Sequence, residues 1–230
     1  MRRRLLVLLA VLAATTANTA SAALAAPANA APAQVQARNP VVFVHGWNGD
    51  SWNWATMIDR LRADGYSAGE LFAWDYDHTQ SNAVIAQQLG QFVDGVLALT
   101  GASQVDVVSH SMGGLNSRYW VKFLGGADKV DDWVNLGGPN HGTTAASLCF
   151  WDVSCFEMRA GSTFLAQLNS GDETPGAVQY TTVRSPCDEV INPDTSTVLS
   201  GATNVQTFCV GHLGLLADWG AYLTVRSALP

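Results

Sequence analysis

The chain has 230 residues, of which 48% are hydrophobic, enough to build a single domain around a sizeable core. Its formal net charge of −7 at pH 7 argues against nucleic acid as a partner. An acidic balance is common in soluble proteins, so it indicates no particular ligand.

The first residues have the pattern of a secretory signal peptide. Three arginines at positions 2–4 precede an apolar run over residues 5–14, and small-residue cleavage motifs end at Ala22 and Ala30. The apolar run is too short for a membrane-spanning helix of about 20 residues, which is the competing interpretation. An arginine pair in this position also leaves twin-arginine export open. Without the three arginines, nine basic residues remain against 19 acidic ones.

Strand and helix patterns alternate along the rest of the chain. In chain order they predict strand 40–44, helix 51–64, strand 71–76, helix 81–99, strand 104–109, helix 112–124 and strand 132–136. After an irregular stretch over residues 138–178, they predict strand 180–184, strand 205–210 and helix 213–227. Such alternation indicates an α/β fold with a mostly parallel sheet of about six strands, flanked by helices on both faces.

Ser111 lies where an apolar strand breaks into a glycine-rich turn, in the string Ser109-His110-Ser111-Met112-Gly113. A sharp strand-to-helix turn exposes a nucleophilic serine only if very small residues stand two positions before and after it. Gly113 meets this demand, and Ser109 replaces the usual leading glycine with another small residue. The string therefore predicts a variant nucleophile elbow, although an ordinary turn between strand and helix is the alternative.

An acid and a histidine follow Ser111 in the chain order typical of hydrolases with such an elbow. Asp188 follows the predicted strand 180–184, and His212 follows the predicted strand 205–210. The carboxyl ends of parallel strands meet at one edge of a sheet, so we expect Ser111, Asp188 and His212 to converge there. Asp188 would orient His212, and His212 would take the proton of Ser111. Asp194 is the alternative acid.

Two backbone N–H groups are expected to form an oxyanion hole. One belongs to Met112, which follows the nucleophile and begins a helix whose positive end points at Ser111. The other belongs to Trp47, in the glycine-rich loop after strand 40–44. His45 in that loop is expected to be a structural hydrogen-bonding residue.

These segments together resemble the class 2 secreted bacterial triacylglycerol lipases, which are minimal α/β-hydrolases without a large cap domain. The matching stretches are residues 39–46, 107–114, 135–139 and 210–216. The resemblance places the family's nucleophile, acid and base on Ser111, Asp188 and His212, and its oxyanion donors on Trp47 and Met112. Residues 143–176 look longer than the shortest family members require.

The resulting domain organisation has three parts. We expect residues 1–30 to be the signal peptide, with cleavage after Ala22 or Ala30, and residues 31–38 to be a flexible leader. Residues 39–230 would form the α/β-hydrolase catalytic domain.

Four cysteines in a secreted chain suggest two disulfides, for which three pairings are possible. Pairing Cys187 with Cys209 would join the loops that carry Asp188 and His212, so we favour it, with Cys149 and Cys155 closing a smaller loop. Metal binding is the competing use of these residues, but their spacing lacks a C-x-x-C pattern. We therefore expect no metal site and no cofactor.

The pattern as a whole predicts a secreted, extracellular carboxylic-ester hydrolase, a triacylglycerol lipase or esterase, that acts through an acyl-enzyme. Short-chain carboxylesterase, polyester hydrolase and phospholipid acyl hydrolase are alternatives within the class, and a peptidase, a thioesterase or a non-catalytic binding protein of the same fold are alternatives outside it. We expect a monomer without an integral membrane segment, with a lipid or ester substrate met at a lipid–water interface.

Aromatic and large apolar residues gather in the two segments expected to flank the site, where they suit either acyl-chain contact or core packing. They are Trp47, Trp52, Trp54, Phe150, Trp151, Phe156, Met158 and Phe164. Residues 143–176 would form either a small lid or a rim pinned by a disulfide.

Overall fold

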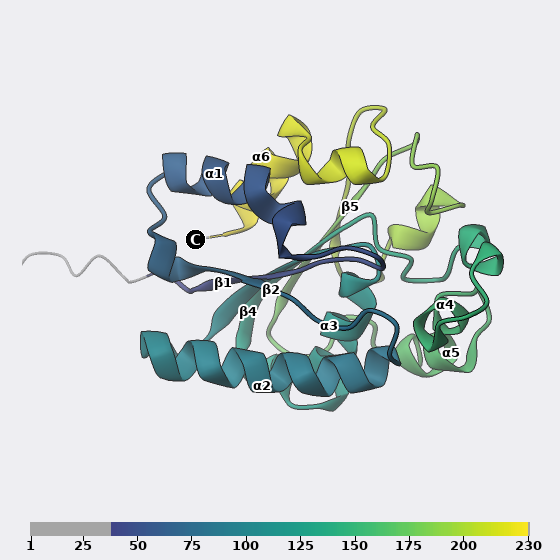
Figure 1. Ribbon diagram of the computed structural model, residues 1–230, viewed down its shortest axis with the longest axis horizontal. Helices are drawn as coiled ribbons and strands as arrows, with labels where there is room; N and C mark the ends of the chain where they lie inside the picture. The colour runs from purple at the N-terminus through teal and green to yellow at the C-terminus, as the bar shows by residue number, and fades with distance from the viewer. Residues whose placement is uncertain (1–37, 230) are drawn as a thin grey trace, which may run out of the picture. The chain divides into compact units, whose positions relative to one another are not determined.

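The computed structural model describes residues 38–229, so the predicted signal peptide and residues 31–37 of the predicted leader lie outside the described part of the chain. The described residues form a six-stranded sheet in the order β2-β1-β3-β4-β5-β6, and every neighbouring pair of strands is parallel. The predicted α/β fold with a parallel sheet is therefore confirmed (Figure 1). No helix within residues 38–229 is both long and apolar enough to cross a membrane.

The elements follow the predicted order through most of the chain. The strands of the described part are β1 (Val41–Val44), β2 (Leu71–Trp74), β3 (Val105–His110), β4 (Val130–Leu136), β5 (Gln179–Arg184) and β6 (Thr203–Gln206). Its α-helices are α1 (Ala55–Ala63), α2 (Asn82–Thr100), α3 (Gly113–Phe123), α4 (Val153–Glu157), α5 (Thr163–Leu168) and α6 (Trp219–Ala228).

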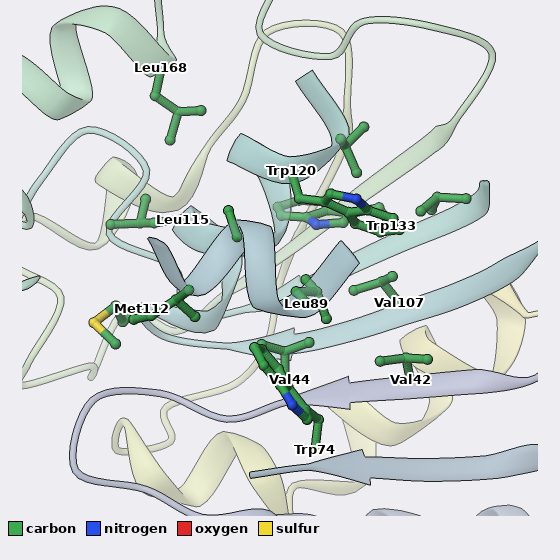
Figure 2. Close-up of a cluster of buried hydrophobic side chains, with 14 of the residues drawn as sticks. Val42, Val44, Trp74, Leu89, Val107, Met112, Leu115, Trp120, Trp133 and Leu168 are labelled. Atoms are coloured by element: carbon green, nitrogen blue, oxygen red, sulfur yellow. The ribbon is translucent and has the colours of Figure 1, made fainter. Parts of the chain in front are cut away.

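Helices cover both faces of the sheet, with α1 and α6 on one face and α2 and α3 on the other (Figure 1). Successive residues of a strand point to opposite faces, so β1 contributes to two separate hydrophobic clusters. Val42 and Val44 pack in the cluster under α2 and α3 (Figure 2), whereas Val41 and Phe43 pack in the cluster under α1 and α6. Burial on both faces explains why β1 is an uninterrupted apolar run.

The last strand and helix differ from their predicted bounds. The apolar run suggested a strand over residues 205–210, but β6 ends at Gln206 because Ser185 and a disulfide at Cys209 hold the following residues in a loop. The predicted helix 213–227 is interrupted: a short 3-10 helix over Leu213–Leu216 precedes α6. Asp218 adopts an extended backbone there, and its side chain accepts a hydrogen bond from Ala221 N, so α6 begins anew.

The stretch predicted to be irregular, residues 138–178, contains short helices. A 3-10 helix over Thr144–Leu148 precedes α4 and α5, each of which is too short to give a clear helical period in the sequence. The predicted disulfide between Cys149 and Cys155 is present at this point, and so is the predicted disulfide between Cys187 and Cys209.

Candidate functional site

Ser111 occupies a sharp turn between β3 and α3. Its backbone φ is +54°, a left-handed conformation that non-glycine residues seldom adopt outside functional turns. Close neighbours exclude larger residues around it: a β-carbon at Gly113 would lie 2.4 Å from Val44 O, and one at Gly46 would lie 2.7 Å from Ser111 Cβ. The turn therefore depends on glycine at both positions.

Ser109, the departure from the usual elbow pattern, is fully buried and hydrogen-bonded to β4. Its hydroxyl donates to Val134 O at 3.0 Å and accepts from Asn135 Nδ2 at 3.1 Å. The hydroxyl is thus satisfied by the neighbouring strand, which explains how a polar residue is tolerated at this buried position.

His212 and Asp188 form a buried pair in which His212 Nδ1 lies 2.8 Å from Asp188 Oδ2. The other carboxylate oxygen, Oδ1, accepts hydrogen bonds from Val190 N at 2.9 Å and Ile191 N at 2.8 Å. A carboxylate accepts, so Nδ1 carries the proton and Nε2 of the neutral ring is left as a proton acceptor. This is the tautomer that a general base for serine requires.

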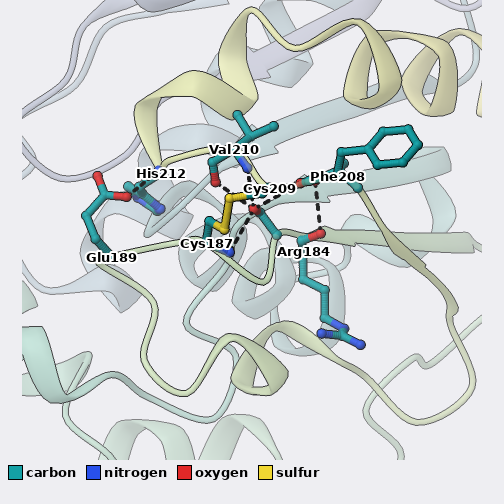
Figure 3. Close-up of a disulfide and its surroundings, with 9 residues drawn as sticks. Arg184, Cys187, Glu189, Phe208, Cys209, Val210 and His212 are labelled. Carbon is teal, nitrogen blue, oxygen red and sulfur yellow. Dashed lines mark hydrogen bonds between the residues drawn. A yellow bond between two sulfur atoms is a disulfide. The ribbon is translucent and has the colours of Figure 1, made fainter.

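The backbone of His212 is fixed at both of its polar groups. Glu189 Oε2 accepts from His212 N at 3.0 Å (Figure 3), and His110 Nε2 donates to His212 O at 3.1 Å. The His110 and His212 rings also pack together, with centroids 4.5 Å apart. Burial, together with the neighbouring His212, lowers the pKa of His110 to about 3, so His110 is a neutral donor.

The Cys187–Cys209 disulfide joins the loop of Asp188 to the loop of His212 (Figure 3). Beside it, Ser185 Oγ donates to Val210 O at 2.6 Å and accepts from Val210 N at 2.9 Å. The acid and the histidine thus come from two chain segments that are tied covalently and by hydrogen bonds.

Ser111 lies at the same edge of the sheet as the Asp188–His212 pair. Ser111 N donates to Leu136 O at the end of β4. Gly137, which follows Leu136, is close to the pair, because a β-carbon there would lie 3.1 Å from Asp188 Oδ2 and 3.3 Å from His212 Cε1. Among the described residues, no hydrogen bond joins Ser111 Oγ to the imidazole. Such contacts are often long in the absence of substrate and tighten in the complex.

The two expected oxyanion donors follow the ends of β1 and β3. Within residues 38–229, neither Trp47 N nor Met112 N donates a hydrogen bond to another residue. Met112 directly precedes α3, whose N-terminal end favours negative charge.

The alternative acid and the other loop histidine have structural partners. Asp194 forms an ion pair with Arg184, not with His212. His45 stacks on Tyr76 with ring centroids 4.0 Å apart, and burial lowers the pKa of His45. Neither residue competes with Asp188 or His212.

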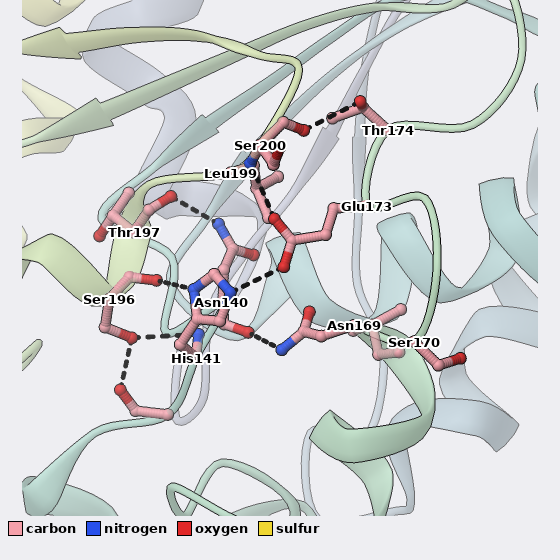
Figure 4. A network of polar contacts seen from close by, with 12 residues as sticks. Asn140, His141, Asn169, Ser170, Glu173, Thr174, Ser196, Thr197, Leu199 and Ser200 are labelled. Atoms are coloured by element: carbon pink, nitrogen blue, oxygen red, sulfur yellow. Dashed lines mark hydrogen bonds and ion pairs between the residues drawn. The ribbon is translucent and has the colours of Figure 1, made fainter.

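A polar network joins the loop after β4 to the segments that precede β5 and β6 (Figure 4). His141 Nε2 lies 2.8 Å from Glu173 Oε1, and Ser200 N donates to Glu173 Oε2 at 2.7 Å. Burial alone would raise the pKa of Glu173, but the hydrogen bonds from Ser200 and His141 lower it below its usual value. The network links the loop after β4 to segments around residues 173 and 200.

Three further residues near the site were not expected from the sequence, because each bonds a residue at least 23 positions away: Asp152, Glu189 and Glu173. Only the position of Glu189 directly after Asp188 gave a signal that could have been used.

The aromatic residues near the site divide between core and surface. Trp54, Met158 and Phe164 are buried, so core packing accounts for them, and Trp47 is half-buried. The remaining ones are exposed: Trp52, Phe150, Trp151 and Phe156.

Comparison with known proteins identifies the family. A family model described as "Lipase (class 2)" matches residues 38–207. A triacylglycerol lipase of Burkholderia plantarii is 34% identical over 126 residues, which cover 52% of this chain and 34% of that lipase. A triacylglycerol lipase of Vibrio cholerae is 29% identical over 123 residues, covering 49% of this chain and 36% of that lipase. The match thus spans about a third of the length of these curated relatives.

Solved structures show the same fold. The mature form of Bacillus licheniformis lipase BlEst2 matches with a TM-score of 0.74 and 19% identity, covering 85% of this chain and 94% of that one. Aspergillus fumigatus lipase B matches with a TM-score of 0.71 and 21% identity, covering 80% of this chain and 50% of that one. Within residues 38–229 the fold is that of an α/β-hydrolase without a large cap. Because the family model covers most of these residues, the chain belongs to the class 2 lipase family.

Proposed function

We propose that the protein is a secreted carboxylic-ester hydrolase that cleaves acyl esters of lipids through an acyl-enzyme on Ser111. The observation that carries the proposal is the strained position of Ser111 at the sheet edge that also holds the hydrogen-bonded pair of His212 and Asp188. Membership of a lipase family and the similarity to triacylglycerol lipases support an ester as the substrate.

The reaction would use these groups in two halves. Ser111 Oγ attacks the ester carbonyl carbon while His212 Nε2 takes the hydroxyl proton, and Trp47 N–H and Met112 N–H stabilise the oxyanion. Collapse expels the alcohol, which takes the proton from His212. Water then attacks the acyl-enzyme, gives its proton to His212, and the acid leaves as Ser111 Oγ regains that proton.

A lipid–water interface as the place of action is supported by apolar side chains near Trp47. Leu148, Phe150 and Trp151 are 79%, 69% and 63% exposed, and the Trp151 ring centroid lies 6.5 Å from that of Trp47. Exposed apolar groups clustered beside a site are typical of surfaces that meet membranes or other partners. The disulfide within this segment favours a pinned rim over a mobile lid.

Secretion is supported by the signal-peptide pattern and by the two disulfides, which persist in oxidising environments outside the cytosol.

The test is hydrolysis of p-nitrophenyl esters from C2 to C16 by wild type and Ser111→Ala, with stoichiometric labelling by a serine-directed phosphonate. We expect labelling and hydrolysis in wild type and neither in the variant. A maximum at long chains would support a lipase, and one at short chains an esterase. Equal rates in both proteins would exclude catalysis by Ser111, and a wild type that neither hydrolyses esters nor takes the label would be a binding protein of this fold.

A further inference from the structure

The indole of Trp47 is held by a carboxylate from a distant part of the chain. Trp47 Nε1 donates to Asp152 Oδ2 at 2.8 Å, although the two residues are 105 positions apart. The ring of Trp47 also packs edge-on against His78, with centroids 5.8 Å apart. Trp47 is therefore held through its side chain as well as by the turn in which Gly49 N donates to Gly46 O.

Asp152 stands at the N-cap position of α4 but does not cap it. Aspartate at this position commonly accepts from a backbone N–H of the first turn, yet no such side-chain bond forms here. Asp152 is only 8% exposed. Among the described residues, the Trp47 indole is the one hydrogen-bond donor to its carboxylate. The carboxylate is directed to Trp47 at the expense of local helix capping.

The segment that carries Asp152 is itself anchored on both sides. The Cys149–Cys155 disulfide closes the loop around Asp152, and Ser154 Oγ donates to His78 O at 2.7 Å. Glu157 accepts hydrogen bonds from Ser81 Oγ and Asn82 N, both at 2.7 Å, at the start of α2. The backbone around Asp152 is therefore held in place by a disulfide and by hydrogen bonds to other segments.

We infer that Asp152 is a positioning residue for the oxyanion hole: it fixes the Trp47 indole and thereby aims the Trp47 backbone N–H at the carbonyl oxygen of the substrate. The inference rests on the proposed function of Trp47. The loop backbone has restraints of its own, since Gly46 is packed against Ser111 and Gly46 O accepts from Gly49 N at 3.2 Å. The bond to Asp152 adds a restraint on the side chain of Trp47 itself. Asp152 touches no reacting atom, so its effect must pass through Trp47.

The test compares Asp152→Ala, Asp152→Asn and Trp47→Phe with wild type on a soluble short-chain ester. We expect Asp152→Ala and Trp47→Phe each to lower kcat about 10- to 100-fold and to change KM less than about twofold. This loss of kcat does not exceed that caused by removing an oxyanion donor completely, about 100- to 1000-fold. Asp152→Asn keeps an acceptor oxygen and should retain most of the activity. The double variant Asp152→Ala, Trp47→Phe should have a kcat no lower than that of either single variant, because both substitutions remove the same hydrogen bond.

Asp218→Ala is the matched control, since Asp218 is also an N-cap aspartate but does cap its helix, α6. It should lower the melting temperature and leave kcat unchanged. Kinetics are measured only on proteins with a cooperative thermal transition, and Trp47→Phe provides the test if Asp152→Ala does not fold.

A kcat within twofold of wild type in Asp152→Ala and Trp47→Phe, or additive losses in the double variant, would overturn the inference. These outcomes are distinct from failure of the proposed function, in which wild type itself neither hydrolyses esters nor takes the phosphonate label.

Discussion

At the level of single residues, the elbow is built by close packing more than by a fixed sequence pattern. Gly113 is required because the carbonyl oxygens of Val44 and His45 would lie within 2.5 Å of any β-carbon there. The position of Ser109 is less restrictive, since its side chain fits between β3 and β4 and bonds both Val134 O and Asn135. A serine in place of the usual glycine thus adds a link between two strands.

Ser109→Ala should therefore destabilise the protein without a large effect on catalysis. The substitution leaves the buried Asn135 amide without one of its partners, a loss of about 1–3 kcal/mol in the free energy of unfolding. Urea denaturation measures this change, and kcat on a soluble ester should stay within about threefold. Unchanged stability would mean that the hydroxyl makes no net contribution.

His110 should contribute to catalysis through its bond to the backbone of His212. His110→Phe keeps a ring but removes the donor to His212 O, so we expect a loss of about 1–3 kcal/mol in stability and a lower kcat. His110→Gln, which can still donate, should restore part of both. Because burial keeps the pKa of His110 at about 3, the pH–rate profile of His110→Gln should retain the acid limb of wild type. A shifted limb would mean that His110 itself titrates during turnover.

At the level of elements, the sequence predicted those strands and motifs that are determined locally. The valine-rich run of β1 and the serine turn after β3 each depend on neighbours within a few residues, so their patterns indicated both structure and position. The contacts of Trp47 with Asp152 and of His212 with Glu189 join segments 105 and 23 residues apart, and no local pattern encodes them. The end of β6 was placed wrongly for the same reason.

The Cys187–Cys209 disulfide should stabilise the two loops that carry Asp188 and His212. It closes a loop with a sequence separation of 22, for which the chain-entropy model gives about 3 kcal/mol. Replacing both cysteines by serine should lower the free energy of unfolding by about that amount and reduce kcat more than KM. Denaturant titration and ester kinetics at 25 °C measure both effects. The disulfide between Cys149 and Cys155 has a sequence separation of only 6, so an equal loss in the free energy of unfolding when it is removed would contradict the dependence on loop length.

At the level of the whole molecule, the sheet separates two polar regions. Ser111, Asp188 and His212 lie at the carboxyl ends of the strands. At the opposite ends of β3 and β4, Asp106 and Asp132 are buried beside the half-buried Asp131, and Asn39 Nδ2 donates to both Asp106 and Asp131. Catalysis and the pH dependence of folding can therefore be altered separately.

The acidic group of Asp106, Asp131 and Asp132 should make the protein less stable as the pH rises. Burial, with repulsion from the neighbouring carboxylates, raises the pKa of Asp106 to about 7 and that of Asp132 to about 6 in the folded state. In the unfolded chain an aspartate ionises near pH 3.9. The folded protein therefore binds more protons between about pH 4 and pH 7, and the free energy of unfolding falls across this range by up to about 1.4 kcal/mol per pH unit for each such proton.

Asp106→Asn removes the group with the largest shift while keeping an oxygen that accepts from Asn39. We expect the variant to be more stable than wild type at pH 8 and to lose less stability between pH 5 and pH 7. Urea denaturation at pH 5, 6, 7 and 8 measures the slope, and the exposed Asp59→Asn is the control that should leave it unchanged. If wild type and Asp106→Asn had the same slope, Asp106 would have to be ionised in the folded state throughout this range. The Asn39 hydrogen bond would then outweigh the cost of burying the charge.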